Sequence, residues 1–379
     1  MSSLNYHSVI PENIQDQYSE HDNVDMVLSF PDRVLNLGSI RIEGELNVVN
    51  NSLPLNNVAN HDLDIKIDNM VGSHSIIESI QTSFGLGVGS IGGEVIENLI
   101  NYPRYVKMDT TARHSQSDLN NASQSCELKS SFDNLEIALL KGEVVKTQPT
   151  ASLRQDPDFS FKPLFCLNSS NSVLAYTQTG DIRVSLNLAR IVSVLHGIDC
   201  SNSCSYNVKN LQLTFTSGID TGTNPKVSLR AKMSISQSIQ SAFANVSAKV
   251  PAVVSSVSCS FNNQLDENTF VNNNLKLVKV PNVKELNFLF NDSSNKGITF
   301  QLRSPVEIVS RYLESFMDTG QNALSRQNMS SNDGYGVGLY FGGDAIDLRN
   351  QKFNTQITSA LNSNEPMIMY MYFHSILNL

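Results

Sequence analysis

Short runs in which hydrophobic and polar residues alternate recur along most of the chain. In the stretch SIRIEGELNVV, Ile40, Ile42, Leu46 and Val48 share one parity, while charged and polar residues occupy the other. Such a period of two is typical of a half-buried β-strand. The same alternation predicts strands over 62–68, 135–145, 181–195, 210–218, 226–236, 285–292, 297–304, 352–358 and 367–377.

Helical spacing is rarer. The best candidates are 235–250 and 305–320, the second with Ser304 as a possible N-cap and Pro305 at the first helical position. A turn or two is expected within 74–84. Another short helix is expected over 93–102, ended by Pro103 and followed by a long polar loop.

Many short strands with few helices predict an all-β sandwich or barrel. Template matching gives about 14 strands, more than the eight of one jelly roll. We expect residues 1–23 to form a polar, extended arm outside the packed structure. A composition change near 217–226 separates a first β domain, 24–218, from a β-rich region, 219–379, which is either a separate domain or a set of strands completing the first.

Two later segments bear on how the strands pack. The apolar run 367–377 must lie centrally in a sheet or cover an interface, because an exposed apolar edge would promote aggregation. The glycine-dense stretch 334–348 indicates close approach of another backbone, from a neighbouring subunit or at a barrel corner.

Composition narrows the functional classes. The chain has 379 residues, of which 17% are charged, and a formal net charge of −9. The nearest approach to a basic stripe, Lys276, Lys279 and Lys284, lies among apolar residues, so we expect no nucleic-acid binding. The five scattered cysteines indicate reduced thiols in an intracellular compartment. No signal peptide and no membrane span are expected.

The stretch GLGVGSIGGEVIENL contains a dinucleotide-binding pattern. Gly87, Gly89 and Gly92 spell G-x-G-x-x-G, and Asp109 follows at about the distance of a ribose-binding acid. A cofactor site also needs a following helix and a parallel strand, which the downstream sequence does not predict. We therefore expect a glycine-rich connection between strands rather than a cofactor site.

Other candidate chemistry is incomplete. His196, Cys200 and Cys204 would supply three zinc ligands, but no fourth lies near in sequence. A cysteine nucleophile would need a histidine partner, and His374 lies in an apolar strand. The carboxylate pairs Asp156/Asp158 and Asp344/Asp347 fall in polar loops. We expect no catalytic residue, no cofactor and no metal, and hence no enzyme.

Two segments carry a resemblance to a known family. In VGSHSIIESIQTSF and GGEVIENLINYPRYVKM, the motif positions are Gly72, Ser75, Ile77 and Ile80, then Asn101 and Tyr102. In FSFKPLFCLNSSNSVLAYTQTGDIRVSLNLA they are Phe161, Pro163, Phe165, Leu174 and Val184. Both segments resemble the jelly-roll capsid proteins of large double-stranded DNA viruses and virophages, over roughly the first 220 residues.

The resemblance implies a structural capsid protein in the virion, assembled in the host cytoplasm. Because the chain is short for a double jelly-roll major capsid protein and ends in a tyrosine-bearing strand, it is most similar to the penton (vertex) proteins of Sputnik-like virophages. That implies a homopentamer at the fivefold vertex, in contact with major capsid protein capsomers and with minor capsid proteins. The alternatives are a receptor- or carbohydrate-binding jelly-roll module and, on Gly87, Gly89 and Gly92, an NAD-dependent enzyme.

Overall fold

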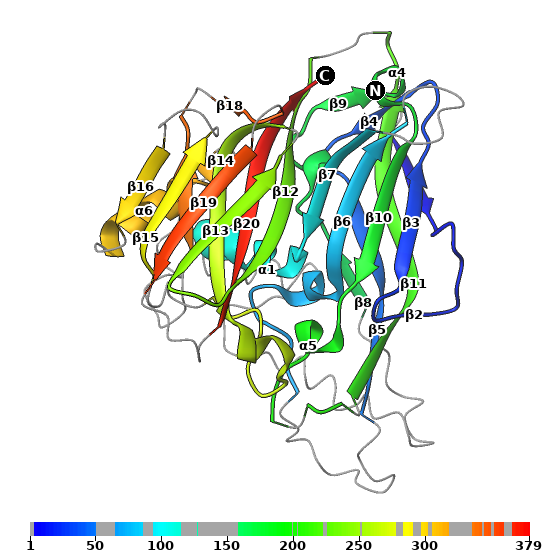
Figure 1. The fold of residues 1–379 in the computed structure, drawn as a ribbon. Helices are drawn as coiled ribbons and strands as arrows, with labels where there is room; N and C mark the ends of the chain where they lie inside the picture. The colour runs from blue at the N-terminus through cyan, green and yellow to red at the C-terminus, as the bar shows by residue number, and fades with distance from the viewer. Residues whose placement is uncertain are drawn as a thin grey trace, which may run out of the picture.

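The structure is a computed structural model, and three β-sheets dominate it (Figure 1). This confirms the expected all-β class. The strand expected at 135–145 lies outside the described residues, as does the start of the run at 62–68. The described residues are 4–50, 65–85, 94–114, 127, 158–198, 200–202, 204–222, 226–250, 252–277, 283–290, 297–301, 305–317, 336–342, 345–349, 352–359 and 366–379.

The first sheet has seven strands built around β11, the 16-residue strand Cys204–Ile219. β5 pairs with β11 in antiparallel register over most of its length, as its alternating residues predict. The other members pair with one of these two strands or with β4. The strands are β1 (Asn5–Val9), β2 (Tyr18–Ser19), β4 (Arg33–Asn36), β5 (Arg41–Asn50), β8 (Asp158–Phe161), β9 (Val173–Ala175) and β11.

The second sheet has nine strands, in the order β17-β14-β20-β12-β7-β6-β10-β3, with β18 beside β14. At one end, β10 lies between the earlier strands β3 and β6, a non-sequential order typical of Greek-key jelly rolls. The strands are β3 (Asn23–Leu28), β6 (Ile77–Phe84), β7 (Glu94–Ile100), β10 (Ile182–Leu188), β12 (Ser228–Ile239), β14 (Val253–Asn263), β17 (Val337–Tyr340), β18 (Ile346–Asp347) and β20 (Met367–Asn378).

The third sheet has four strands, in the order β13-β19-β15-β16. Its strands are β13 (Phe243–Lys249), β15 (Val283–Phe290), β16 (Gly297–Gln301) and β19 (Lys352–Ser359). The described α-helices are α1 (Tyr102–Arg113), α4 (Tyr176–Thr179), α5 (Ile191–Val194) and α6 (Pro305–Glu314), and short 3₁₀ turns cover Gly72–Ile76, Cys166–Asn168 and Gln264–Asn268.

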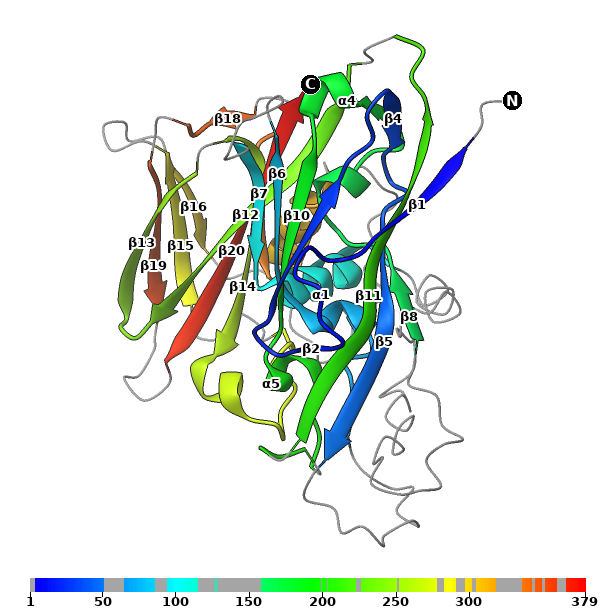
Figure 2. The ribbon, with the colours of Figure 1, turned by 90° about the vertical axis from the view of Figure 1, so that its right-hand side faces the viewer.

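The three sheets form layers, with the nine-stranded sheet in the middle (Figure 2). One half of this central sheet and the seven-stranded sheet enclose the first hydrophobic core. The other half and the four-stranded sheet enclose the second, so the chain forms two sandwiches, one around each core. The first core also contains Leu277, Tyr312 and Tyr372 from beyond residue 218. Residues from both sides of position 218 thus share one core, and the expected domain boundary at 218/219 stays a prediction.

The C-terminal strand β20 lies inside the central sheet. It pairs with β12 on one side and with β14 on the other, which confirms the expected central position of the apolar run. Its alternate faces enter different cores: Met369 and Met371 join the second core, and Tyr370 and Tyr372 join the first. A strand that is buried on both faces does not need polar residues at alternate positions, and this explains its nearly continuous apolar sequence.

The N-terminal arm is packed, contrary to the expectation for residues 1–23. β1 pairs with β11 along the edge of the first sheet. His7 stacks on Phe215 with ring centroids 4.7 Å apart, and Tyr18 is buried. An edge strand exposes one face to solvent, so this segment can be rich in polar residues. In sequence, such a composition looks the same as that of an unstructured arm.

Two predicted helices are wrong. Residues 93–102 contain strand β7, because Glu97 and Leu99 both point inward and the buried glutamate conceals the period of two. Residues 235–250 contain the end of β12 and all of β13, since Val246 and Ala248 are buried at strand spacing. The helix expected over 305–320 is confirmed by α6, whereas its cap candidate Ser304 lies outside the described residues.

The glycine-dense stretch 334–348 permits close packing within the chain. A Cβ added at Gly336 would lie 2.0 Å from the Cys259 carbonyl oxygen on β14. One added at Gly338 would lie 2.2 Å from Ser315 Oγ, just beyond α6. The close approach expected from the sequence is therefore made by β14 and α6 of the same chain.

Candidate functional site

The centre of the molecule is a buried polar junction around α1, which contacts parts of both sandwiches. Every residue from Tyr102 to Ala112 is buried, although the helix has no apolar stripe. The segment after Pro103 is thus a helix and not the expected polar loop. Asn101 turns the chain out of β7 with a φ of 55°, and Pro103 lies in the first turn, where a proline fits.

Three ion pairs hold the charged residues of α1. Lys107 Nζ lies 2.8 Å from Asp68, and Arg113 bonds Asp109 one turn away. Burial tends to raise the pKa of Asp68 and of Asp109, but the neighbouring cations outweigh it and hold both pKa values below the usual range. These carboxylates are therefore ionised at neutral pH.

The third pair leads into the second half of the chain. Arg104 Nη2 donates to the Glu267 carboxylate over 3.0 Å, and the guanidinium lies 4.3 Å from the centre of the Tyr370 ring. Glu267 also accepts from Asn262 Nδ2 at 2.7 Å and from the Tyr370 hydroxyl at 2.6 Å. Three side chains, from α1, β14 and β20, thus converge on the carboxylate of Glu267, which lies in the Gln264–Asn268 turn.

Glu97 forms a second link, between β7 and β12. Its carboxylate accepts from the backbone N–H groups of Cys166 at 2.8 Å and of Lys232 at 3.1 Å, and Lys232 Nζ lies 3.8 Å away. Burial raises the pKa of Glu97 despite these donors. Sequence reasoning missed Glu97 because an acid at an inward strand position breaks the hydrophobic pattern.

Tyr102 joins the two segments that carry the family resemblance. Its hydroxyl lies 2.7 Å from His74 Nδ1 and accepts from the backbone N–H of Leu164 at 3.0 Å. Asn101 is half-buried. The following motif side chains are buried, and they lie around this contact or in the adjoining first core: Ser75, Ile77, Ile80, Tyr102, Phe161, Phe165, Leu174 and Val184. Their role in this fold is packing.

The topology contradicts the dinucleotide-binding hypothesis. Gly87, Gly89 and Gly92 lie outside the described residues, but the strands on either side, β6 and β7, are antiparallel neighbours. A dinucleotide site needs a helix and a parallel crossover after the first strand. Asp109, the candidate ribose-binding acid, is buried in α1 and bonded to Arg113.

The other candidate residues do not converge on a chemical site. Within the described ranges no three histidine, cysteine or acidic side chains are placed to hold a metal; Cys200 and Cys204 are buried. His374 Nε2 lies 3.0 Å from Ser258 Oγ, and burial lowers the pKa of His374 to about 3. This pair is sealed from solvent, so it cannot meet a substrate.

The remaining charged candidates are exposed or outside the described residues. Asp347 pairs with Arg349 on the surface, while Asp156, Asp344 and Lys279 lie outside the described part of the chain. Lys276 and Lys284 are exposed. The described helices include none that is both long and apolar enough to span a membrane.

Comparisons with known proteins identify the fold. No protein-family model and no curated protein sequence matches the chain. Among solved structures, VP54 of PBCV-1, fitted into a reconstruction of the virophage Sputnik, aligns with a TM-score of 0.59 and 8% identity over 100% of this chain and 95% of that one. The Faustovirus major capsid protein gives 0.55 and 8% over 100% and 90%. The mavirus major capsid protein gives 0.51 and 8% over 99% and 90%.

These alignments confirm the expected capsid jelly-roll fold. They also correct the argument from length, since a chain of 379 residues spans nine-tenths or more of these neighbours. The Faustovirus and mavirus neighbours are major capsid proteins, and the likeness does not single out a vertex protein. The chain has the fold of the jelly-roll capsid proteins of large DNA viruses and virophages.

Proposed function

We propose that the protein is a structural subunit of an icosahedral viral capsid. The observation that carries this proposal is that the whole chain, including both sandwiches, aligns on capsid subunits of nearly its own length. The low charge of the chain supports it as well, because uncharged polar surfaces oppose close packing of copies only weakly.

Two sandwiches in one chain favour a trimeric capsomer. Three copies arranged around a threefold axis present six similar sandwiches, which suits a lattice position surrounded by six neighbours. The junction around α1 supports this arrangement. It fixes one sandwich against the other through Arg104, Glu267, Tyr370 and Tyr372, so a copy can dock as one body.

The pentameric vertex role expected from the sequence is the second candidate. Its two supports were chain length and the terminal strand. The length agrees with major capsid proteins, and β20 is enclosed between β12 and β14 rather than held ready for an interface. The number of copies in one capsomer distinguishes the two roles: three for the first and five for the second. The mass of the purified capsomer measures this number directly.

A further inference from the structure

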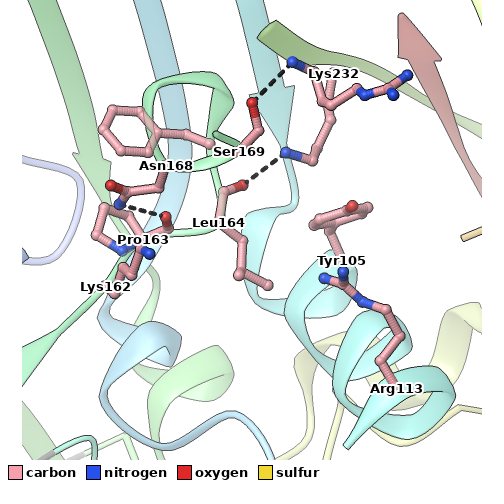
Figure 3. Close-up of a pocket in the computed structure, with 10 residues that line it drawn as sticks. Tyr105, Arg113, Lys162, Pro163, Leu164, Asn168, Ser169 and Lys232 are labelled. Atoms are coloured by element: carbon pink, nitrogen blue, oxygen red, sulfur yellow. Dashed lines mark hydrogen bonds between the residues drawn. The ribbon is translucent and has the colours of Figure 1, made fainter. Parts of the chain in front are cut away.

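A cavity of about 70 Å³ lies where the end of α1, the segment after β8 and the beginning of β12 meet (Figure 3). Four of its ten lining residues are cationic, and none of the ten is acidic. The four are Arg113, Lys162, Arg230 and Lys232. In a chain with a formal net charge of −9, this concentration of positive charge needs a cause.

The cations are held in place by neighbours behind the cavity wall. Lys232 is 4% exposed, and its Nζ lies 3.3 Å from the Leu164 carbonyl oxygen. The backbone N–H of Arg230 donates to Ser169 Oγ at 2.8 Å. The carboxylates that contact Lys232 and Arg113, Glu97 and Asp109, do not line the cavity. The charged ends of Lys232 and Arg113 are therefore held in position beside an open volume.

Two buried donors at this cavity have no acceptor within the described part of the chain. Tyr105 is fully buried, and no hydrogen-bond partner for its hydroxyl exists among the described residues. The same holds for Arg113 Nε within the described part of the chain. Figure 3 shows the Tyr105 ring between the ends of Lys232 and Arg113, and Lys232 Nζ lies 5.5 Å from the ring centre. Buried donors without acceptors are rare in native proteins and point to a ligand or ion.

We propose that this cavity binds a small inorganic oxyanion of the size of phosphate or sulfate. Arginine and lysine donors with a tyrosine hydroxyl match the several acceptor oxygens of such an anion. The volume equals that of about two water molecules, which is too small for a nucleotide. Lys162, half-buried at the wall, has a lowered pKa, first through burial and then through nearby Arg41, and an anion paired with its ammonium group would offset both effects. The inference does not depend on the capsid role.

The test is binding of sodium phosphate to the purified full-length protein at constant ionic strength. Phosphate and sulfate should raise the thermal midpoint in a saturable way, whereas sodium chloride and sodium acetate should not, because a ligand that binds the native state stabilises it. Calorimetric titration then gives the dissociation constant for phosphate. Equal stabilisation by chloride, or stronger binding of acetate, would overturn the assignment of a tetrahedral oxyanion.

Variants locate the site. Lys162→Gln and Arg230→Gln, both at partly exposed positions, should each weaken phosphate binding roughly tenfold, as loss of one charged hydrogen bond does. Tyr105→Phe should weaken it a few-fold. Lys249→Gln removes the same charge from the exposed face of β13 and should leave binding unchanged. If Lys162→Gln and Arg230→Gln bind phosphate as the wild type does, the cavity is not the site.

Discussion

The Tyr372 hydroxyl donates a 3.1 Å hydrogen bond to the Asn101 carbonyl, across a sequence separation of 271 residues. One partner lies on the C-terminal strand β20, and the other starts the buried helix α1. Tyr372→Phe removes this bond and keeps the ring packed against Tyr105. We expect the free energy of unfolding to fall by about 1 kcal/mol in urea titrations. Tyr6→Phe, at an exposed tyrosine, should change nothing; an equal loss there would contradict a specific link.

Glu267 should be among the most costly acids to remove. Glu267→Ala leaves buried Arg104 without its carboxylate and also removes the acceptor for Tyr370 and Asn262. Stranding a buried charge lowers the free energy of unfolding by roughly 3 kcal/mol. Asp347→Ala breaks an exposed pair with Arg349 and should leave stability unchanged within error. Similar losses in both variants would contradict the greater cost expected for the buried pair.

The buried histidine should make the protein sensitive to acid. Its surroundings lower the pKa of His374 to about 3, first by burial and then by Lys232, whereas the unfolded chain has a value near 6.5. Below pH 6.5 the unfolded state binds a proton that the folded state excludes, so stability falls as the pH drops from 6.5 toward 3. The contribution approaches 1.4 kcal/mol per pH unit. His374→Phe should flatten the decline over this range in denaturant titrations, and parallel curves for variant and wild type would contradict this.

The contact between β17 and α6 depends on an absent side chain. Gly338→Ala places a Cβ 2.2 Å from Ser315 Oγ and 3.1 Å from the Arg311 carbonyl oxygen. The helix must shift, and we expect a loss of about 1–3 kcal/mol in unfolding free energy. At Gly218, where an added Cβ meets only Val34 Cγ2 at 3.4 Å, the same substitution should be nearly neutral. Thermal unfolding of both variants compares them directly, and equal midpoints would contradict this packing.

The alternating strands could be predicted because each has one face in a core and one outside it. β5, β10 and β11 show this pattern, and they form where it places them. The helix α1 could not be predicted, because its burial depends on ion pairs with Asp68 and Glu267, which are distant in sequence. β13 was misassigned because its partner β19 begins about a hundred residues later, and only that pairing makes it a strand.

The candidate site could be predicted from the sequence to a smaller extent than the fold could. The glycine motif and the His196, Cys200, Cys204 set resemble known chemistry locally, yet antiparallel pairing and burial leave no such site in the described structure. The residues that matter, among them Glu97, Tyr105 and Lys232, are brought together from α1, β7 and β12 only by folding. No local spacing signals such a set.

The number of copies in the native assembly tests the proposed capsid role most directly. Light scattering on the size-fractionated protein measures it, and a single chain has a mass of 41.8 kDa. We predict a particle of three chains, with six lobes around a threefold axis in electron micrographs of the same fraction. A particle of five chains would support the vertex role instead. A monomer at every concentration would contradict assembly by this chain alone.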